Sequence, residues 1–345
     1  MPYPSLQGSA PRLWPRGLAI LAIITVLALA FAYTAGWLAP QRLTPGRVID
    51  QFQRNAGVFP GYRRNHAKGV CILGAFHSSG LAASISRAAV FAPGATSPVV
   101  GRLAIPGSNP YAADASVPIR SLALRFALPN GQQWRTGMNA MPVFAVATPQ
   151  AFYAQLQAQQ PVPATGKPDP ARLAAFFAAH PETAPFRAWA RTATASPSYA
   201  TERYNSLDAF EFVNSRGRRQ AVRWSMVPDQ PPSAPGDRPA GNEDGLAADL
   251  KVRLQQGPLQ WHLLITLAAP GDPTNDATRA WPQGRPQIDA GTLVLSTESP
   301  QDQGSCRAPH YAPLVLPDGI QASADPPPPA RSAVSAGSHP PRPRR

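Results

Sequence analysis

The sequence predicts an α+β protein built on an antiparallel β-barrel of about eight strands, with helices packed on its flanks. Short stretches typical of strands recur along the body of the chain, and two of them are joined by a tight hairpin turn. Two further segments carry helix-start signals. A hydrophobic content of 43% is typical of a globular body. Closing the sheet into a barrel would remove its exposed edges.

The first predicted strands precede residue 150. They cover residues 70–76, 99–105, 122–126 and 143–147. Leu122, Leu124 and Phe126 alternate with Ala123 and Arg125, which is the period-2 pattern of a half-buried strand. The Pro-Asn-Gly sequence at 129–131 then predicts a turn that reverses the chain.

The remaining predicted strands lie in the second half of the body. Phe210 and Phe212 face Val222 and Trp224 across a short polar turn at 215–218, which indicates a second hairpin. Apolar stretches at 259–267 and 292–296 complete the set.

Two helices are predicted between these groups of strands. Thr148-Pro149 and Asp169-Pro170 each place a capping side chain directly before a proline at the first helical position. The apolar residues that follow recur three and four positions apart, so we expect both helices to face the core. Residues 228–245 are polar and rich in proline, which favours a surface loop.

The N-terminus carries a long apolar segment. Residues 17–38 contain no charged side chain, and a bilayer core needs about 20 helical residues. Trp14, Tyr33 and Trp37 lie near its ends, where amphipathic rings favour the membrane interface. The segment predicts a single-pass anchor. Cleavage as a signal peptide is the alternative, because Ala28 and Ala30 form a small-x-small site.

The anchor divides the chain into five parts. They are a tail (1–16), the transmembrane anchor (17–38), a connector punctuated by proline and glycine (39–60), the barrel core (61–325) and a Pro/Arg-rich tail (326–345). Arginines flank the anchor equally on both sides, so the positive-inside count is a tie. We expect an inner-membrane protein with its body in the periplasm, because long domains cross largely regardless of charge.

Charge and cysteine usage restrict the function classes. The net charge of +13 fits a solvated basic surface near anionic lipid. No basic run is interleaved with aromatics, so nucleic-acid binding is not expected. Cys71 and Cys306 lie in no metal-ligand pattern. A disulfide is possible in an exported body, but two separate buried thiols are the favoured interpretation.

A series of short motifs follows in the body, and the first carries a histidine. Residues 63–69 read Arg-Arg-Asn-His-Ala-Lys-Gly, which places His66 on a loop directly before a predicted strand. Alone, such a histidine is more often structural than catalytic. Further motifs follow in order at residues 101–107, 121–126, 138–144, 272–282 and 316–332.

Together these motifs resemble those of haem catalases, and especially the short, membrane-anchored or exported catalase-related peroxidases. The resemblance implies a catalase-like fold without the C-terminal helical region of full catalases. It also implies haem b as the cofactor, peroxide as the substrate and a small organic electron donor. The identity of the donor and the oligomeric state stay open.

The resemblance also implies roles for individual residues. His66 would be the distal acid–base, and Asn139 would hold the peroxide by a hydrogen bond. Arg63 and Arg102 would pair with the haem propionates. Phe152 would pack on the porphyrin face, although it also occupies a natural core position of its helix.

Some positions depart from the family pattern. Ala104 stands where catalases place a serine that hydrogen-bonds the distal histidine. On the proximal side, the family pattern is Arg-x-x-x-Tyr, with the tyrosinate bound to iron. Arg331 is present, but the ligand position holds Ser335, so the metal ligand is unknown. His339 is a competing ligand, although Pro340 disfavours helical geometry there.

Three functions follow from these observations. The first is a haem-dependent peroxidase of the catalase family. The second is a haem-deficient catalase-fold pseudoenzyme or binding protein, which the serine at position 335 favours. A basic membrane-bound scaffold that uses the arginine-rich tail is the third.

Overall fold

The computed structural model describes residues 14–34, 43–231 and 245–323, and the chain divides into two compact units. The first unit is Met1–Thr44 and the second is Pro45–Arg345. Each unit is described by itself.

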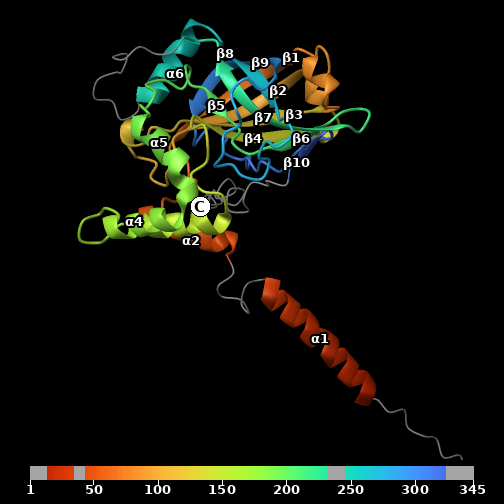
Figure 1. Ribbon diagram of the computed structural model, residues 1–345, viewed down its shortest axis with the longest axis vertical. Helices are drawn as coiled ribbons and strands as arrows, with labels where there is room; N and C mark the ends of the chain where they lie inside the picture. The colour runs from red at the N-terminus through yellow and green to blue at the C-terminus, as the bar shows by residue number, and fades with distance from the viewer. Residues whose placement is uncertain (1–13, 35–42, 232–244, 324–345) are drawn as a thin grey trace, which may run out of the picture. The chain divides into compact units, whose positions relative to one another are not determined.

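The described residues of the first unit form the helix α1 (Trp14–Thr34), drawn in red in Figure 1. Its Gly17–Thr34 window has a mean hydropathy of 2.3 and is long enough to cross a membrane. A signal sequence has the same length and composition. Both interpretations of the N-terminal segment therefore stay open at this point.

The second unit is built around one antiparallel sheet (Figure 1). Its strands are β1 (Gly69–Ser78), β2 (Thr96–Ala104), β3 (Ser121–Ala127), β4 (Gln133–Asn139), β5 (Tyr204–Asn205), β6 (Phe210–Val213), β7 (Arg219–Pro228), β8 (Leu259–Leu267), β9 (Gln287–Pro300) and β10 (Ile320–Ala322). The helices are α2 (Pro45–Ala56), α3 (Pro149–Ala158), α4 (Pro170–Ala179), α5 (Ala184–Thr192) and α6 (Gly245–Gln256).

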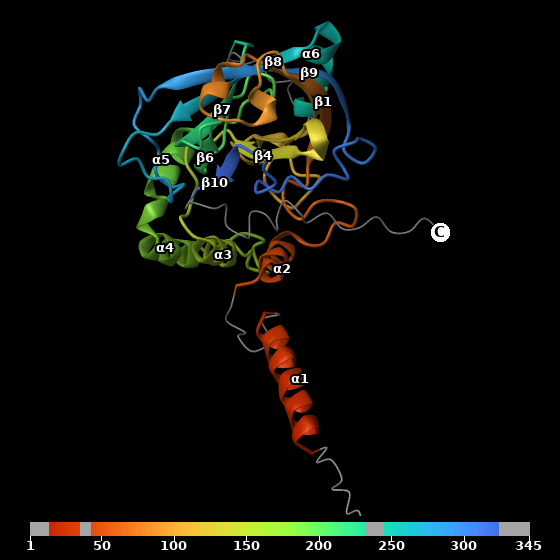
Figure 2. The ribbon, with the colours of Figure 1, turned by 90° about the vertical axis from the view of Figure 1, so that its right-hand side faces the viewer.

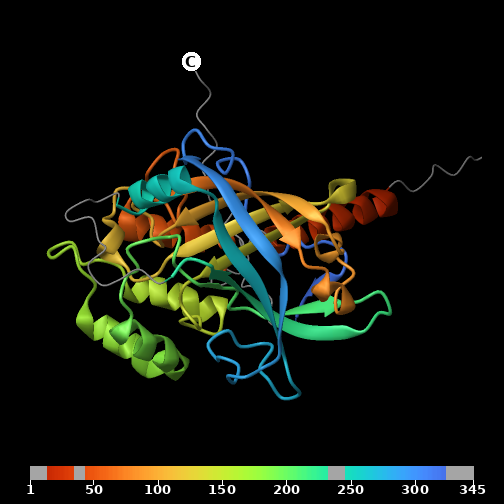
Figure 3. The ribbon, with the colours of Figure 1, turned by 90° about the horizontal axis from the view of Figure 1, so that it is seen from above.

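The sheet closes on itself. The strand order is β10-β6-β7-β5-β4-β3-β2-β1-β9-β8, and an additional β7–β8 pairing joins the two sides. Eight strands therefore form a closed barrel, while β6 and β10 extend it beside β7. Figure 3 shows β8 and β9 crossing the barrel side by side. The predicted fold class, an eight-stranded antiparallel barrel with flanking helices, is confirmed.

The barrel interior is packed with apolar and aromatic side chains. Trp134, Trp224 and Phe126 are almost fully buried there. The Trp134 ring stacks on Phe126 with centroids 4.7 Å apart and meets Trp224 edge-on at 5.2 Å. Such ring contacts add to the hydrophobic stabilisation of the core. The interior of the barrel is therefore filled by this core.

Most predicted strands are confirmed, but two differences have clear causes. Residues 143–147 do not form a strand, because the Phe144 N–H donates to the Ala277 carbonyl in a loop instead of to a neighbouring strand. The sequence analysis also missed β4. In that strand Thr136 faces the core, where its hydroxyl accepts a hydrogen bond from Trp224 Nε1 at 3.1 Å.

The two predicted helix starts are confirmed by their caps. Thr148 Oγ1 accepts from the Ala151 N–H at 3.1 Å, and Asp169 Oδ1 accepts from the Ala171 N–H at 2.8 Å. The connector contains the helix α2, which was not expected. Its Val48 and Phe52 are buried, and Phe52 lies against Phe152 of α3. Figure 2 shows α2, α3 and α4 gathered at one end of the barrel.

The preference for two separate thiols was wrong. Cys71 of β1 and Cys306 form a disulfide, with Cα atoms 5.2 Å apart. Gly304 makes this approach possible: an added Cβ there would lie 2.5 Å from the Cβ of Cys71 and 2.6 Å from Ser299 Oγ. The segment after β9 therefore returns across β1 and is fastened to it.

Candidate functional site

His66 lies on a loop that the backbone holds in an unusual conformation. Its φ is 54°, in the left-handed region that side chains other than glycine rarely adopt. Asn65 stabilises this turn, because its Oδ1 accepts from both the His66 N–H and the Gly107 N–H, each at 2.9 Å. The Ala67 N–H in turn donates to the Gly107 carbonyl at 2.9 Å. Strained backbone held by several hydrogen bonds is typical of functional sites.

The lysine of the same motif fixes the far side of the loop. Lys68 Nζ lies 3.0 Å from Asp114 Oδ1 and donates to the Ala112 carbonyl at 2.8 Å. Asp114 Oδ2 also accepts from the Leu246 N–H, at the start of α6. The Lys68 side chain therefore ties the histidine loop to two other segments of the body.

The structure brings His66 and Asn139 into one hydrogen-bonded chain. His66 Nε2 lies 3.1 Å from Ser121 Oγ, and the Ser121 hydroxyl donates to Asn139 Oδ1 at 2.6 Å. Ser121 begins β3 and Asn139 ends β4, where the two residues lie directly opposite each other. Ser121 thus links the two predicted catalytic residues, and Asn139 also acts on His66 directly through a hydrogen bond that raises the His66 pKa.

The electrostatic environment keeps the His66 ring neutral. Its pKa is lowered from 6.5 to about 3, first by burial and then by the positive charges of Arg102 and Arg63. A lowered pKa in a histidine favours the form with one unprotonated ring nitrogen. At neutral pH the side chain is therefore able to accept a proton.

Arg102 lies on the outer face of the barrel wall, directly opposite Cys71 in the β1–β2 ladder. Only 4% of the residue is exposed, and its guanidinium donates to the Ala67 carbonyl at 3.3 Å and to the amide oxygen of Gln301. Both acceptors are neutral. Burial, followed by the charge of Arg63, lowers the pKa of Arg102 to about 9. This buried cation would gain from an anionic partner.

Gly69 makes room for that guanidinium. A Cβ at this position would lie 2.8 Å from the Arg102 Cζ and would also meet the Leu103 carbonyl oxygen. The glycine that ends the His-Ala-Lys-Gly motif therefore has a steric role, because any larger side chain would displace Arg102.

Arg63 is held by the segment that the disulfide fastens. Its Nη2 donates to the Cys306 carbonyl at 3.0 Å and to the Pro309 carbonyl at 2.8 Å. The guanidinium also lies over the ring of Tyr311, 5.6 Å from the centroid. Tyr311 Oη is buried without a hydrogen-bond partner among the described residues, and burial raises the Tyr311 pKa to about 12.

Phe152 makes its ring contacts with other aromatic side chains. Phe152 packs in α3 with Phe52 and Phe144, at centroid distances of 6.1 and 5.8 Å. Its position fits the core role that the sequence also allowed. Arg331 and Ser335 lie outside the described residues. Within the described residues, no cluster of histidine, cysteine or carboxylate side chains suits a metal ion.

The sequence analysis missed Ser121, Asn65 and Tyr311. Asn65 and Ser121 fall inside the recognised motifs, but nothing in their spacing shows that each bonds to a partner on another segment. Tyr311 had no signal, because its contacts with Arg63 and with the disulfide cysteines join segments that are far apart in the chain.

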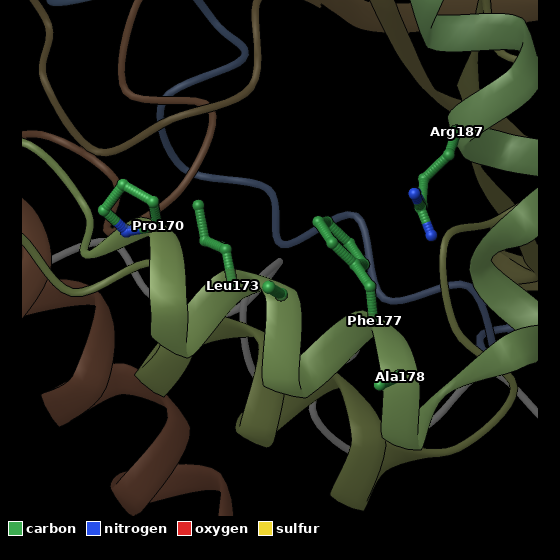
Figure 4. Close-up of a pocket in the computed structure, with 6 residues that line it drawn as sticks. Pro170, Leu173, Phe177, Ala178 and Arg187 are labelled. Carbon is green, nitrogen blue, oxygen red and sulfur yellow. The ribbon is translucent and has the colours of Figure 1, made fainter.

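A separate groove of about 520 Å³ runs between α4 and α5. It is lined by Pro170, Leu173, Ala174, Phe177, Ala178 and Arg187. Figure 4 shows Leu173 and Phe177 projecting from α4 towards the space that Arg187 borders. The Arg187 guanidinium lies 4.4 Å from the centroid of the Phe177 ring. None of these side chains belongs to the polar group around His66.

Comparison with known proteins gives consistent matches. The model of the family described as Catalase matches residues 49–332. A catalase-related peroxidase of Synechococcus elongatus is 38% identical over 333 residues, which cover 96% of this chain and 97% of the relative. A catalase-related peroxidase of Mycolicibacterium paratuberculosis is 30% identical over 287 residues, covering 82% and 90%.

Solved structures share the fold. A fungal catalase superposes with a TM-score of 0.70 at 20% identity, over 81% of this chain and 58% of that one. Catalase A from Saccharomyces cerevisiae gives a TM-score of 0.69 at 22% identity, over 81% and 60%. The chain thus spans little more than half of these full catalases but nearly all of its shorter relatives. It belongs to the catalase family, and within that family it is one of the short, catalase-related peroxidases.

Proposed function

We propose that this protein is a haem-dependent peroxidase that reduces peroxide with electrons from a small organic donor, and that its cofactor is haem b. The relatives named catalase-related peroxidases support a peroxide-reducing function. The observation that carries the proposal is the hydrogen-bonded group of His66, Ser121 and Asn139 beside the buried Arg102.

The residues on the distal side fit the cofactor. Arg102 is a buried cation whose hydrogen bonds go to neutral acceptors, and the charge of Arg63 acts on it. Two guanidinium groups in a desolvated site suit the paired carboxylates of haem, because charge-assisted hydrogen bonds are the strong ones. Arg63 and Arg102 would hold the propionates, and Phe152 would border the ring. Haem supplies the redox chemistry when it is bound.

The chain itself supplies proton handling and orientation. The neutral His66 ring would accept a proton from one peroxide oxygen and return it to the departing oxygen. Asn139 orients the peroxide through a hydrogen bond. Each hydrogen peroxide molecule would take up two electrons and two protons and leave as two water molecules, with the electrons coming from the donor.

A second candidate is a catalase-fold protein that does not turn over haem. The serine at position 335 favours it, because a neutral hydroxyl is a poor ligand for ferric iron. The two candidates differ in the fraction of purified protein that carries haem. Absorbance at about 400 nm measures this fraction, because bound haem absorbs there.

The Ser335→Tyr variant is expected to bind haem more tightly than the wild-type chain. Arg331 and position 335 have the four-residue spacing of the family's Arg-x-x-x-Tyr pattern, in which the arginine charge keeps the tyrosine ionised as an iron ligand, so a tyrosine there would complete that pattern. The measurement is a haem titration of full-length protein, followed by absorbance and by retention of haem on desalting.

Two further variants serve as controls for that titration. Ser332→Tyr adds the same side chain one position after Arg331, outside the four-residue spacing of the family's pattern. It should leave haem affinity low. His339→Ala tests the competing ligand, and a loss of tight haem in this variant would assign the iron to His339 instead. Tight binding unaffected by any of the three changes would contradict the proposed ligand position.

We further infer a single-pass inner-membrane protein with its catalytic body in the periplasm. The apolar α1 and the disulfide support this, since disulfides persist in oxidising compartments. Alkaline phosphatase fused to the C-terminus should be active, because that enzyme needs export, and a cytoplasmic reporter at the same point should be inactive. The reverse pattern would contradict the orientation.

A further inference from the structure

One hydroxyl group joins the two residues to which the proposed function gives catalytic roles. Ser121 Oγ is 3.1 Å from Nε2 of His66, which lies on the loop before β1, and 2.6 Å from Oδ1 of Asn139. Ser121 is buried. The contact therefore forms in a place where a hydrogen bond competes little with water.

The direction of the two bonds fixes the position of a proton. A serine hydroxyl has one hydrogen, and Ser121 donates it to Asn139. The hydroxyl oxygen then serves as the acceptor for His66, so Nε2 must carry the ring proton. A neutral imidazole has only one such proton, which leaves Nδ1 of His66 as the basic nitrogen.

The strand that carries Ser121 is held firmly at this point. The Arg120 side chain donates to the Ser196 carbonyl at 2.8 Å and to the Val117 carbonyl at 3.0 Å. The Arg120 carbonyl accepts from the Ala140 N–H at 2.8 Å, directly after Asn139. Because these hydrogen bonds hold the start of β3 in place, the Ser121 hydroxyl can fix the orientation of a histidine on a loop.

The strand register also relates Ser121 to Ala104. Ser121 lies directly opposite Ala104 of β2 on one side and Asn139 of β4 on the other. Directly opposite residues share a face of the sheet, with Cβ atoms about 4.5–5.5 Å apart. A methyl group occupies position 104, so the neighbouring strand supplies the hydroxyl on this face.

We propose that Ser121 is the positioning residue of this site. Its hydroxyl holds the His66 ring and the Asn139 amide as one unit and sets His66 in the form protonated at Nε2. The catalytic meaning of this assignment rests on the proposed function. The assignment itself concerns side chains of this chain and is tested without haem.

The first test is nitrogen-15 NMR of haem-free, full-length protein in detergent, labelled at histidine. Comparison with His66→Gln assigns the His66 signals. In the wild type, Nε2 should show the shift of a protonated nitrogen and Nδ1 that of an unprotonated one. In Ser121→Ala, the two ring nitrogens of His66 should show averaged shifts, because the ring exchanges between the forms protonated at Nε2 and at Nδ1. Identical shifts in the two proteins, or a proton on Nδ1 in the wild type, would overturn the proposal.

The second test moves the hydroxyl to the adjacent strand. Ser121→Gly should lower kcat by about 10- to 100-fold with little change in KM, because a misplaced base weakens only the transition state. Adding Ala104→Ser to this variant should restore much of the activity. It should also return the neutral His66 ring to a single form, protonated at one nitrogen. Ser97→Ala, which removes a buried hydroxyl near the other end of β2, should change neither.

The two tests separate the positioning role from the proposed function. Normal activity and unchanged shifts in Ser121→Gly, together with an inactive His66→Ala, would reject the positioning role and keep the peroxidase. A wild-type chain that lacks peroxidase activity with haem supplied, but whose His66 form depends on Ser121, would reject the peroxidase and keep the positioning role.

Discussion

His66→Ala is expected to lower kcat for peroxide reduction by about 10²–10⁴-fold, the usual scale of a positioned acid–base group. Haem content should change little, because His66 is expected to act on the peroxide and not as an iron ligand. Steady-state kinetics and the absorbance ratio of the purified variant provide the two measurements. His77→Ala is the matched control, since His77 is exposed at the other end of β1.

The pH profile offers an independent check on the same residue. The pKa of His66 is lowered to about 3, so the ring stays neutral and able to accept a proton at any higher pH. We expect kcat/KM for peroxide to be flat between about pH 5 and pH 8. A decline with falling pH centred near 6.5, the ordinary histidine value, would contradict this assignment. Full activity in His66→Ala would remove the mechanism altogether.

Removal of the disulfide is expected to lower the free energy of unfolding by about 2–5 kcal/mol. The bond joins residues that are 235 positions apart, so it restricts most of the unfolded chain. Urea unfolding of Cys306→Ser, compared with the oxidised wild type, measures the effect. Activity should fall as well, because Arg63 donates to the carbonyls of Cys306 and Pro309.

The control for this experiment is the double variant with serine at both cysteine positions. It removes the crosslink without leaving an unpaired, buried Cys71 thiol. The double variant and chemically reduced wild type should unfold at similar urea concentrations. An unfolding midpoint equal to that of the oxidised wild type would mean that the disulfide adds no stability.

The sequence predicted those parts of the fold that depend on local pattern. The predicted strand at 259–267 matches β8, because an apolar residue occupies every second position from Leu259 to Leu267. The hairpin between β6 and β7 follows from its turn, where Gly217 adopts a φ of 75°. The cap at Thr148 was visible because the capping residue and proline are adjacent. These features need only neighbouring residues.

The features that were missed depend on distant contacts. β4 was overlooked because a polar Thr136 occupies a core position, and its partner Trp224 lies 88 residues away. The disulfide requires the return of the chain over β1, which no spacing indicates. The role of Ser121 is similar, because the motif comparison drew attention to the alanine at position 104. Only the strand register shows that the next strand carries a hydroxyl directly opposite.

Under the proposed function, the disulfide also bears on how well the protein resists oxidation. Peroxide oxidation of cysteine begins at the thiolate, and both cysteines of this chain are already joined to each other. The sulfur atoms of Met138, Met141 and Met226 belong to buried residues, out of easy reach of a dissolved oxidant. Among the described residues, the sulfur atoms are therefore either joined in the disulfide or buried, which would limit their oxidation if peroxide is the substrate as proposed.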